Sequence, residues 1–289
     1  MLADSVVGGP RVTIGHRTPD GNSSHAIEVP AFGLGVFQMT EADECKNSVL
    51  FALLNGYRHI DTAMAYGNEA GVGEAIRASG VPRNEIFVTT KLRQPHATGE
   101  AEAEKRCRQS LDNLGLDHID LYLVHAPAEN VEHRESTWRG MENCLEQGLA
   151  RAIGVSNHGA HHLDRMRAAA RYLPAVNQIE VHPWLQRPAL LAATRAIGAT
   201  PMAYSPLARG HKVTDPSLVA IAERLGCTPS QVAIRWCIDA GCITIPKSSD
   251  EGRIIENIGS LDIDISSETE ALAALEANYV SGWDPTSDP

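Results

Sequence analysis

From residue 31 onward the chain alternates between short apolar segments and longer segments with helical periodicity, and this rhythm constrains the fold most strongly. The longer segments carry helix-start signals, as at Thr228-Pro229 with Gln231 and at Thr40 with Asp43. Strands that alternate with helices build parallel sheets. The strand candidates are FGLGV, HID, IFVTTKL, IDLYLVH, RAIGVS, AVNQIE, PMAYSP and CITIPK.

Eight such units predict an α/β fold, a (β/α)8 TIM barrel, because closure removes the edges of the sheet and lets the helices cover its outside. An open, doubly wound sheet is the alternative. RVTI and IEVP flank a turn at Asp20-Gly21, which predicts an N-terminal β-hairpin over one end of the barrel. SSETEALAALEAN predicts an extra C-terminal helix. Because no linker-like run divides the chain, we expect one domain over residues 1–289.

The charge and the cysteines narrow the choice of partners. A net charge of −11 repels phosphate backbones, so nucleic acid is not an expected partner. No segment reaches the roughly 18 apolar residues of a membrane span, and MLADSVVGGP lacks the pattern of a signal peptide. Six cysteines without CxxC spacing fit a reducing compartment. We therefore expect a cytoplasmic monomer that acts on a small molecule, with no metal.

Polar side chains stand at the carboxyl ends of three consecutive predicted strands. Asp61 ends the second strand and Tyr66 follows in its loop, while Lys91 lies near the end of the third and His125 ends the fourth. In a barrel the carboxyl ends of the strands carry the active site, and neighbouring strands lie about 4.8 Å apart. An acid, a phenol, an amine and an imidazole are therefore expected to meet over a small patch.

These groups suit the reduction of a carbonyl to an alcohol. The ammonium of Lys91 would stabilise the phenolate of Tyr66 and so bring down a pKa that is ordinarily about 10. Asp61 would keep the amine charged, and His125 would orient the substrate oxygen or assist proton transfer. The alternative is a structural ion pair between Lys91 and Asp61, beside two ordinary half-buried polar residues.

Seven segments resemble, in order, the characteristic segments of the aldo-keto reductases, over about residues 28 to 260. They are GYRHIDTAMAYGNE, VTTKL, DLYLVHAP, IGVSN, NQIEVHP, AYSPL and IPKSSDEGRIIEN. GLGVFQM and the short loops resemble microbial and protozoan members, of the 2,5-diketogluconate reductase and prostaglandin F synthase type, that reduce sugar-derived dicarbonyls or small aldehydes.

The resemblance implies a barrel that uses NADPH without a metal, with Asp61, Tyr66, Lys91 and His125 as the catalytic residues. It further implies that Tyr204 stacks under the nicotinamide ring. Three residues would hold the carboxamide, namely Ser156, Asn157 and Gln178. Other implied cofactor contacts are Asp61, Gly35, Val36, Phe37, Ser205, Pro206 and Leu207, with Glu256 and Asn257 at the adenine.

The segment after the eighth predicted strand has the character of a phosphate site. Lys247, Ser248, Ser249 and Arg253 lead into a helix, and barrels often bind phosphate there through helix N–H groups and cations. We expect Lys247 and Arg253 to bind the 2′-phosphate of NADPH. The alternative is a solvated helix start with two ordinary cations, which the neighbouring acidic residues favour.

Two positions depart from the pattern of many relatives, which carry a tryptophan directly after the catalytic histidine and another two residues beyond the catalytic lysine. Here those residues are Ala126 and Arg93. The loss of two rings predicts a wider, more polar substrate pocket, with Phe37 and Trp283 as its remaining aromatic walls. Small polar or anionic carbonyl compounds, α-dicarbonyls included, are the expected substrates.

Two rival functions stay open at this point. One is a regulatory or sensor barrel that binds a nicotinamide nucleotide but turns it over slowly. The other is a metal-dependent hydrolase or isomerase, which would need several His and carboxylate ligands at strand ends. Only His125, Asp61 and Glu180 would qualify as ligands there.

Overall fold

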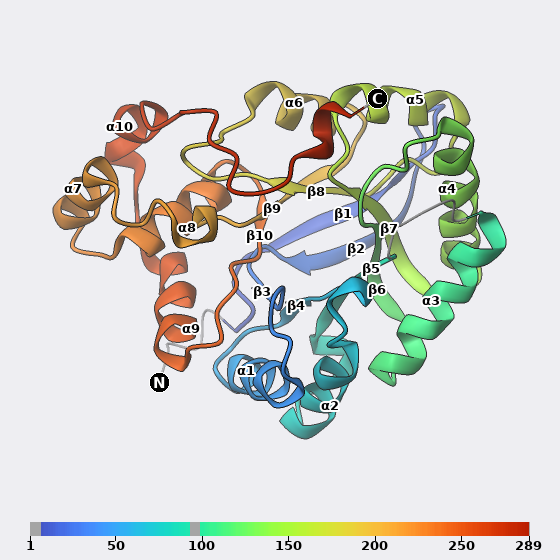
Figure 1. Ribbon diagram of the computed structural model, residues 1–289, viewed down its shortest axis with the longest axis horizontal. Helices are drawn as coiled ribbons and strands as arrows, with labels where there is room; N and C mark the ends of the chain where they lie inside the picture. Colours follow the sequence, from blue (N-terminus) through green and yellow to red (C-terminus); the bar gives the residue numbers. More distant parts are fainter. Residues whose placement is uncertain (1–6, 93–98, 289) are drawn as a thin grey trace.

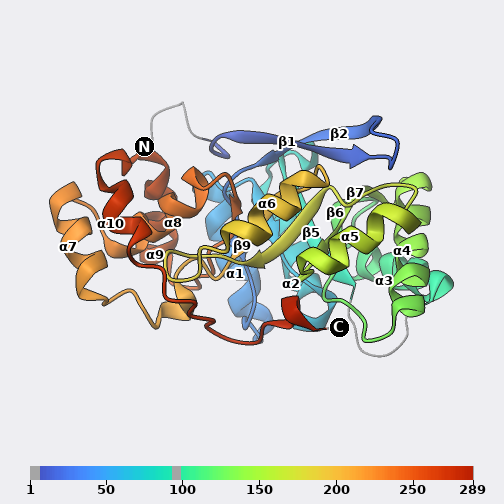
Figure 2. The ribbon, with the colours of Figure 1, turned by 90° about the horizontal axis from the view of Figure 1, so that it is seen from above.

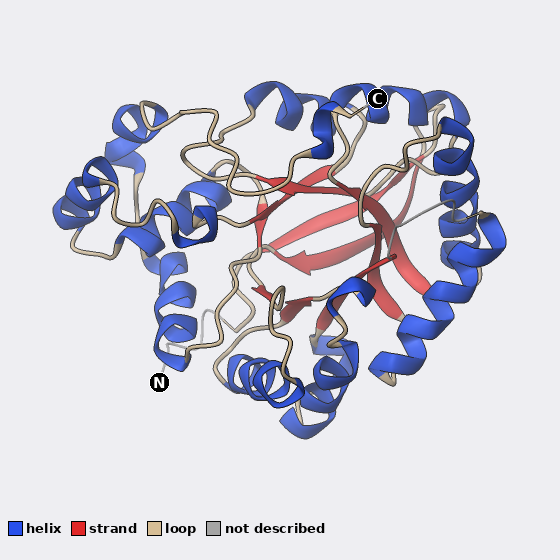
Figure 3. Ribbon diagram, viewed as in Figure 1, coloured by secondary structure: helices blue, strands red, loops and turns tan. Residues whose placement is uncertain are grey.

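Eight parallel strands form one curled sheet in the computed structural model, which describes residues 7–92 and 99–288. The strands run in chain order around the sheet, and helices surround it (Figures 1 and 3). The strands are β3 (Leu34–Gly35), β4 (His59–Asp61), β5 (Phe87–Leu92), β6 (Ile119–Val124), β7 (Ala150–Ser156), β8 (Val176–Glu180), β9 (Thr200–Tyr204) and β10 (Ile243–Thr244). The predicted barrel is confirmed, and the open doubly wound sheet is excluded.

A helix follows each strand, with one exception to the predicted regularity. Two helices, α7 and α8, lie between β9 and β10. The barrel helices are α1 (Ala42–Leu54), α2 (Glu69–Ser79), α3 (Glu100–Leu114), α4 (Val131–Glu146), α5 (Ala160–Ala169), α6 (Pro188–Ala196), α7 (Pro216–Leu225), α8 (Pro229–Asp239) and α9 (Glu251–Ile258). Within the described part of the chain, no helix has the length and apolar character that a membrane span requires.

The barrel closes where its first and last strands meet. Phe32 pairs with Thr244 and Gly35 pairs with Lys247 in parallel bridges, and the amide of Gly35 donates to the carbonyl of Pro246 at 3.0 Å. A Cβ atom at Gly35 would lie 2.9 Å from the carbonyl oxygen of Ile245. Because real side chains do not tolerate so short a contact, the glycine permits the close approach of the strands.

The predicted hairpin covers one end of the barrel (Figure 2). It consists of β1 (Arg11–Arg17) and β2 (Ser23–Pro30), which pair in antiparallel fashion. Ile14 and Val29 are buried and pack in one cluster with barrel residues such as Leu121 and Met202. The hairpin therefore completes the apolar core at the end of the barrel where the strands begin.

His16 joins the hairpin to the barrel through two hydrogen bonds. Its Nδ1 lies 2.8 Å from the carbonyl oxygen of Leu173, and the backbone N–H of Ile153 donates to its Nε2 at 3.1 Å. The acceptor role of Nε2 requires a neutral ring. Burial lowers the pKa of His16 to about 4, which keeps the ring neutral at physiological pH.

Of the two capping boxes predicted from the sequence, one is present and one is absent. At α8, Thr228 and Gln231 form the predicted capping box. The predicted capping box at Thr40 and Asp43 is wrong, because α1 begins at Ala42 with Glu41 at the N-cap and no side-chain cap bond. Each pattern is a weak local preference, and packing decides which residue occupies the cap.

The C-terminal segment lies at the end opposite the hairpin (Figure 2). The predicted extra helix is present but short, since α10 spans Thr269–Ala273 after a 3-10 turn at Ser266–Glu268. Beyond it, residues 274–288 run across the carboxyl ends of the strands and finish in a second 3-10 turn, Pro285–Ser287.

The neutral state of His16 predicts a specific loss of stability in acid. An unfolded histidine titrates near 6.5, so between about pH 6.5 and 4 the unfolded state binds more protons than the folded one. This contribution is fully present above pH 6.5 and declines as the pH falls toward 4. From pH 7 to pH 5 the wild type should lose about 2 kcal/mol more unfolding free energy than His16→Gln.

Urea unfolding at the two pH values measures this difference. His211→Gln, at an exposed histidine outside the hairpin, serves as the control. Equal acid sensitivity in the wild type and in His16→Gln would contradict the assignment.

Candidate active site

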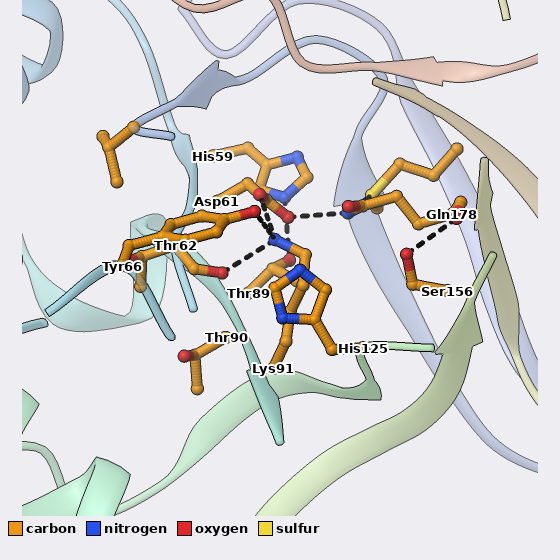
Figure 4. A network of polar contacts seen from close by, with 12 residues as sticks. His59, Asp61, Thr62, Tyr66, Thr89, Thr90, Lys91, His125, Ser156 and Gln178 are labelled. Carbon is orange, nitrogen blue, oxygen red and sulfur yellow. Dashed lines mark hydrogen bonds and ion pairs between the residues drawn. The ribbon is translucent and has the colours of Figure 1, made fainter. Parts of the chain in front are cut away.

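Four polar side chains meet where β4, β5 and β6 end (Figure 4). Asp61 is the last residue of β4, Lys91 is the second-to-last residue of β5, and His125 directly follows β6. Tyr66 ends the 3-10 turn Met64–Tyr66 that follows β4. Parallel pairing places Asp61 beside Thr89 and Lys91 beside Leu123, which aligns the strand ends. The structure therefore brings together the four residues that the strand-end pattern singled out.

Lys91 is the centre of the group. Its side chain is fully buried, and its Nζ contacts three oxygens: Asp61 Oδ1 at 2.5 Å, the carbonyl of Thr62 at 2.8 Å and the Tyr66 hydroxyl at 3.4 Å. Three acceptors match the three donors of an ammonium. The geometry thus fits a charged Lys91 that is bound to a carboxylate and directed at a phenol.

The electrostatics of the buried pair favour the charged lysine. Burial acts to lower the pKa of Lys91, but the charges of Asp61 and of the Tyr66 oxygen outweigh it, and the pKa is raised. For Asp61, burial raises the pKa, and the hydrogen bonds from Lys91 and Gln178 oppose that rise. We regard the pair as ionised, because both carboxylate oxygens accept hydrogen bonds.

Tyr66 is partly buried and lies among aromatic rings. Its ring centroid is 5.1 Å from that of Phe37 and 5.6 Å from that of His125. Burial raises the pKa of the Tyr66 phenol, and the Lys91 ammonium only partly opposes that rise. The expected net decrease of this pKa is therefore not found, and Tyr66 is a neutral phenol that has a proton to donate.

His125 lies beside Tyr66 without a charged partner among the described residues. Burial lowers its pKa to about 3, and the charge of Lys91 adds to the effect. The imidazole is therefore neutral at pH 7, so it can hydrogen-bond to a substrate oxygen without adding a second cation beside Lys91. Its backbone carbonyl accepts a hydrogen bond from Asn157 Nδ2 at 2.9 Å.

A chain of amide and hydroxyl groups continues from Asp61 across the barrel. Gln178 Nε2 donates to Asp61 Oδ2 at 2.7 Å, and the Ser156 hydroxyl donates to the backbone carbonyl of Gln178 at 2.8 Å. The Tyr204 hydroxyl donates to Asn157 Oδ1 at 2.8 Å. Both ends of the Asn157 amide thus have protein partners, whereas the Gln178 side-chain oxygen accepts no hydrogen bond from the described residues.

These side chains line a cleft with a volume of about 630 Å³. This is within the range of pockets that hold a ligand and a cofactor. Of the residues predicted from the sequence, the cleft is lined by Gly35, Phe37, Asp61, Tyr66, His125, Ser156, Asn157, Gln178, Tyr204, Ser205, Pro206, Leu207, Lys247, Ser248, Ser249, Arg253, Asn257 and Trp283. No His, Cys, Asp or Glu cluster that could hold a metal occurs among the described residues.

One end of the cleft carries the predicted anion site. Asp250 caps α9 by accepting the backbone N–H of Arg253 at 2.8 Å. The side chain of Arg253 is 69% exposed, and its Nε lies 3.8 Å from Asp250 Oδ1. A surface ion pair of this length is weak. Lys247 is exposed and makes no ion pair with the described residues. Both cations are therefore available to an anion in the cleft.

Some predicted site residues lie elsewhere. Val36 is fully buried in the core beneath β3, and Ala126 is buried outside the cleft lining. The carboxylate of Glu256 accepts the Thr228 hydroxyl at 2.7 Å and does not line the cleft. Arg93 falls outside the described residues. The sequence could not predict that Val36 is buried or that Glu256 pairs with Thr228. Both depend on how distant parts of the chain pack together.

The cleft also contains residues that the sequence pattern did not single out. Arg209 follows the AYSPL segment, has a left-handed backbone with a φ of 54°, and holds its guanidinium 5.7 Å from the Phe37 ring. A cation two residues after a strand-end motif was the available signal. The other unpredicted lining residues are Gln38, Ala65, Gly210, Ser230, Ile245 and Pro246.

Comparison with known proteins agrees with this arrangement. Residues 31–276 match the model of the aldo/keto reductase family. A glyoxal reductase of Bacillus subtilis is 42% identical over 90% of this chain and 94% of its own length. A morphine 6-dehydrogenase of Pseudomonas putida is 41% identical over 93% of this chain and 95% of its own.

A solved structure is similar over nearly the whole chain. It is that of a Bombyx mori aldo-keto reductase in complex with NADP, with a TM-score of 0.83 and 34% identity. The likeness covers 96% of each of the two chains.

Proposed function

The chain belongs to the aldo/keto reductase family and is an NAD(P)H-dependent oxidoreductase, and from that premise we propose that it reduces small polar carbonyl compounds with NADPH. The observation that carries the proposal is the contact of the buried Lys91 ammonium with both Asp61 and the Tyr66 hydroxyl. Within the proposal, α-dicarbonyl compounds are the preferred substrates and alcohols are the products.

The residues of the cleft fit NADPH. The free Gln178 oxygen can accept a carboxamide N–H, and the Tyr204 ring lines the cleft as a surface for the nicotinamide. At the far end Lys247 and Arg253 supply two cations, with the Ser248 and Ser249 hydroxyls beside them. This set of donors suits a 2′-phosphate. Asn157, with both amide ends occupied, would support Ser156 and Tyr204 more than it would bind the carboxamide itself.

Tyr66 is the proposed proton donor. When bound, NADPH would supply the hydride for the carbonyl carbon. The neutral Tyr66 hydroxyl gives its proton to the carbonyl oxygen, so that an alcohol and a phenolate result. The Lys91 ammonium, 3.4 Å away, stabilises the phenolate as its charge develops.

Asp61 and His125 complete the proposed machinery. Asp61 fixes the position of Lys91 and keeps it charged through the 2.5 Å ion pair. His125, neutral and beside the Tyr66 ring, would donate a hydrogen bond to the substrate oxygen and so orient it toward the phenol.

The substrate class is supported by the shape and polarity of the cleft. The cation Arg209 lines the cleft and faces the Phe37 ring. One relative is named for glyoxal, a small dicarbonyl, and another for morphine, a much larger compound. The open, polar lining leads us to favour the former class for this chain.

We also propose that residues 1–289 form one reductase domain that acts as a monomer. Residues 31–276 match the family model, and the side chains of the proposed machinery come from one chain.

Replacement of the proposed proton donor should remove the chemistry while binding persists. Tyr66→Phe is expected to lower kcat by about 10²- to 10⁴-fold, because the phenolic proton acts only in the chemical step. NADPH affinity, measured by fluorescence titration, should stay within about twofold of the wild type. Tyr122→Phe is the matched control, since its buried hydroxyl has no hydrogen-bond partner among the described residues. Near-normal turnover by Tyr66→Phe would mean that another group donates the proton.

Removal of the two cations should weaken NADPH selectively. Lys247→Ala combined with Arg253→Ala is expected to raise the Kd of NADPH at least about tenfold, while the Kd of NADH changes little. Titration of both nucleotides against the double variant measures the ratio. Equal weakening of the two nucleotides would remove the 2′-phosphate assignment.

A kinetic panel tests the substrate class. We expect kcat/KM for methylglyoxal to exceed that for a bulky aromatic ketone by at least about tenfold, because the bulky ketone lacks the second polar group that the cleft can bind. Steady-state rates with NADPH at one pH decide it. A clear preference for the bulky ketone would reject small dicarbonyls as substrates.

A further inference from the structure

The C-terminal segment rests on the connection between β8 and α6. The backbone N–H groups of Ala277 and Tyr279 both donate to the carbonyl of Trp184, at 3.1 and 3.0 Å. The N–H of Gln186 donates to Glu276 Oε2 at 2.6 Å. Residues 276–279 thus follow the path of this connection, directly before the chain reaches the cleft.

Two charged residues of β8 and this connection then hold the segment on either side of Trp283. Glu180 Oε1 accepts the backbone N–H of Ser281 at 2.8 Å. Arg187 donates to Asp284 Oδ2 at 2.7 Å and to the Thr286 hydroxyl at 2.8 Å. The backbone is therefore fixed two residues before Trp283 and one residue after it.

Both anchors are removed from bulk water, which strengthens them relative to ordinary surface pairs. Glu180 is 2% exposed, and the side chain of Arg187 is 10% exposed against 25% for Asp284. Burial would raise the pKa of Asp284, yet the hydrogen bonds from Arg187 and Thr286 outweigh it and lower that pKa. Loss of one partner would leave the other charge poorly compensated.

The backbone of Arg187 has a left-handed conformation, with a φ of 48°. This conformation is strained for a non-glycine residue and persists where the surroundings hold it. The two bonds from its guanidinium to the C-terminal segment are such a constraint.

Trp283 itself lines the cleft, but its ring has little other support. It is 61% exposed, and no aromatic contact or hydrogen bond holds its side chain among the described residues. A Cβ placed on the preceding Gly282 would lie 2.4 Å from Arg209 Nη2, and the Arg209 guanidinium is 5.7 Å from the Phe37 ring. The segment thus approaches the aromatic wall next to Tyr66, and its backbone anchors determine where Trp283 lies.

We propose that Glu180 and Arg187 are positioning residues that hold Trp283 at the mouth of the cleft, where it narrows the entrance and favours small carbonyl substrates. The selectivity rests on the proposed function, whereas the anchoring does not. Strand β8 then serves the site twice: Gln178 contacts Asp61 at the reacting end, and Glu180 holds the segment that limits access.

Kinetics of Arg187→Gln and Glu180→Ala test the selectivity, since each change removes the hydrogen-bonding groups that hold the C-terminal segment. The ratio of kcat/KM for methylglyoxal to that for a bulky aromatic ketone should fall about tenfold, a typical effect of a small change in pocket fit. The fall should come from a lower KM for the bulky ketone, which enters more readily once Trp283 no longer narrows the cleft, while the kcat for methylglyoxal stays within about twofold. Arg187→Lys keeps one charge but not the two-fold donation, so it should give an intermediate ratio.

Double variants show whether the anchors act through the tryptophan. Trp283→Ala should produce the same loss of selectivity, and Arg187→Gln added to Trp283→Ala should change the ratio no further. Additive effects would overturn the proposal. Arg106→Gln, which removes an exposed ion pair with Glu102 on α3, is the matched control and should leave the ratio unchanged.

Hydrogen exchange measured by mass spectrometry tests the anchoring without any substrate. Amides of residues 280–288 should exchange at least about tenfold faster in Arg187→Gln than in the wild type. Asp284→Asn offers the same test from the less buried partner if Arg187→Gln fails to fold. Unchanged exchange in the folded variants would overturn the proposal. If the wild type reduces none of the carbonyl compounds, the proposed function fails while the exchange result still decides the anchoring.

Discussion

The buried ion pair between Lys91 and Asp61 is the interaction on which the rest of the site depends. A lysine that is fully buried needs a countercharge and acceptors for its remaining protons, and Asp61 at the end of β4 and the following Thr62 supply them. This requirement ties the register of two strands to the position of a phenol. The same carboxylate accepts from Gln178 on β8, so the network joins neighbouring and distant strands across the barrel. A small slip of any of these strands would leave a charge unpaired in the core.

The architecture could be predicted from the sequence because it follows from periodicity. Short apolar segments alternating with helical ones lead to the barrel, and the rule that strand ends carry the chemistry leads to Asp61, Lys91 and His125. The predictions that failed concern properties that depend on packing between distant parts of the chain. Burial raises the pKa of Tyr66 by more than the charge of Lys91 lowers it. The hydrogen-bond partner of Glu256 is Thr228, which lies 28 residues away in the chain. The same dependence applies to Gly73 in α2, where a Cβ would overlap the Leu114 carbonyl oxygen.

The two ends of the barrel are built for different purposes. At the end where the strands begin, the hairpin contributes Ile14 and Val29 to the core, and His16 accepts a backbone hydrogen bond there. At the other end the C-terminal segment lies over the cleft, where backbone bonds to Trp184 and side-chain bonds from Glu180 and Arg187 hold it. The end that receives ligands is therefore crossed by a segment that individual hydrogen bonds and an ion pair hold in place.

The barrel closes between β3 and β10, and this contact should separate more easily than the contacts between the other strands. Each of these strands is only two residues long, and the bridges that join them include the pair of Gly35 with Lys247, both of which line the cleft. Local unfolding of the barrel should therefore begin where β3 and β10 meet. A nucleotide bound across the contact between β3 and β10 would hold the two strands together. The melting temperature of the protein should then rise with nucleotide concentration.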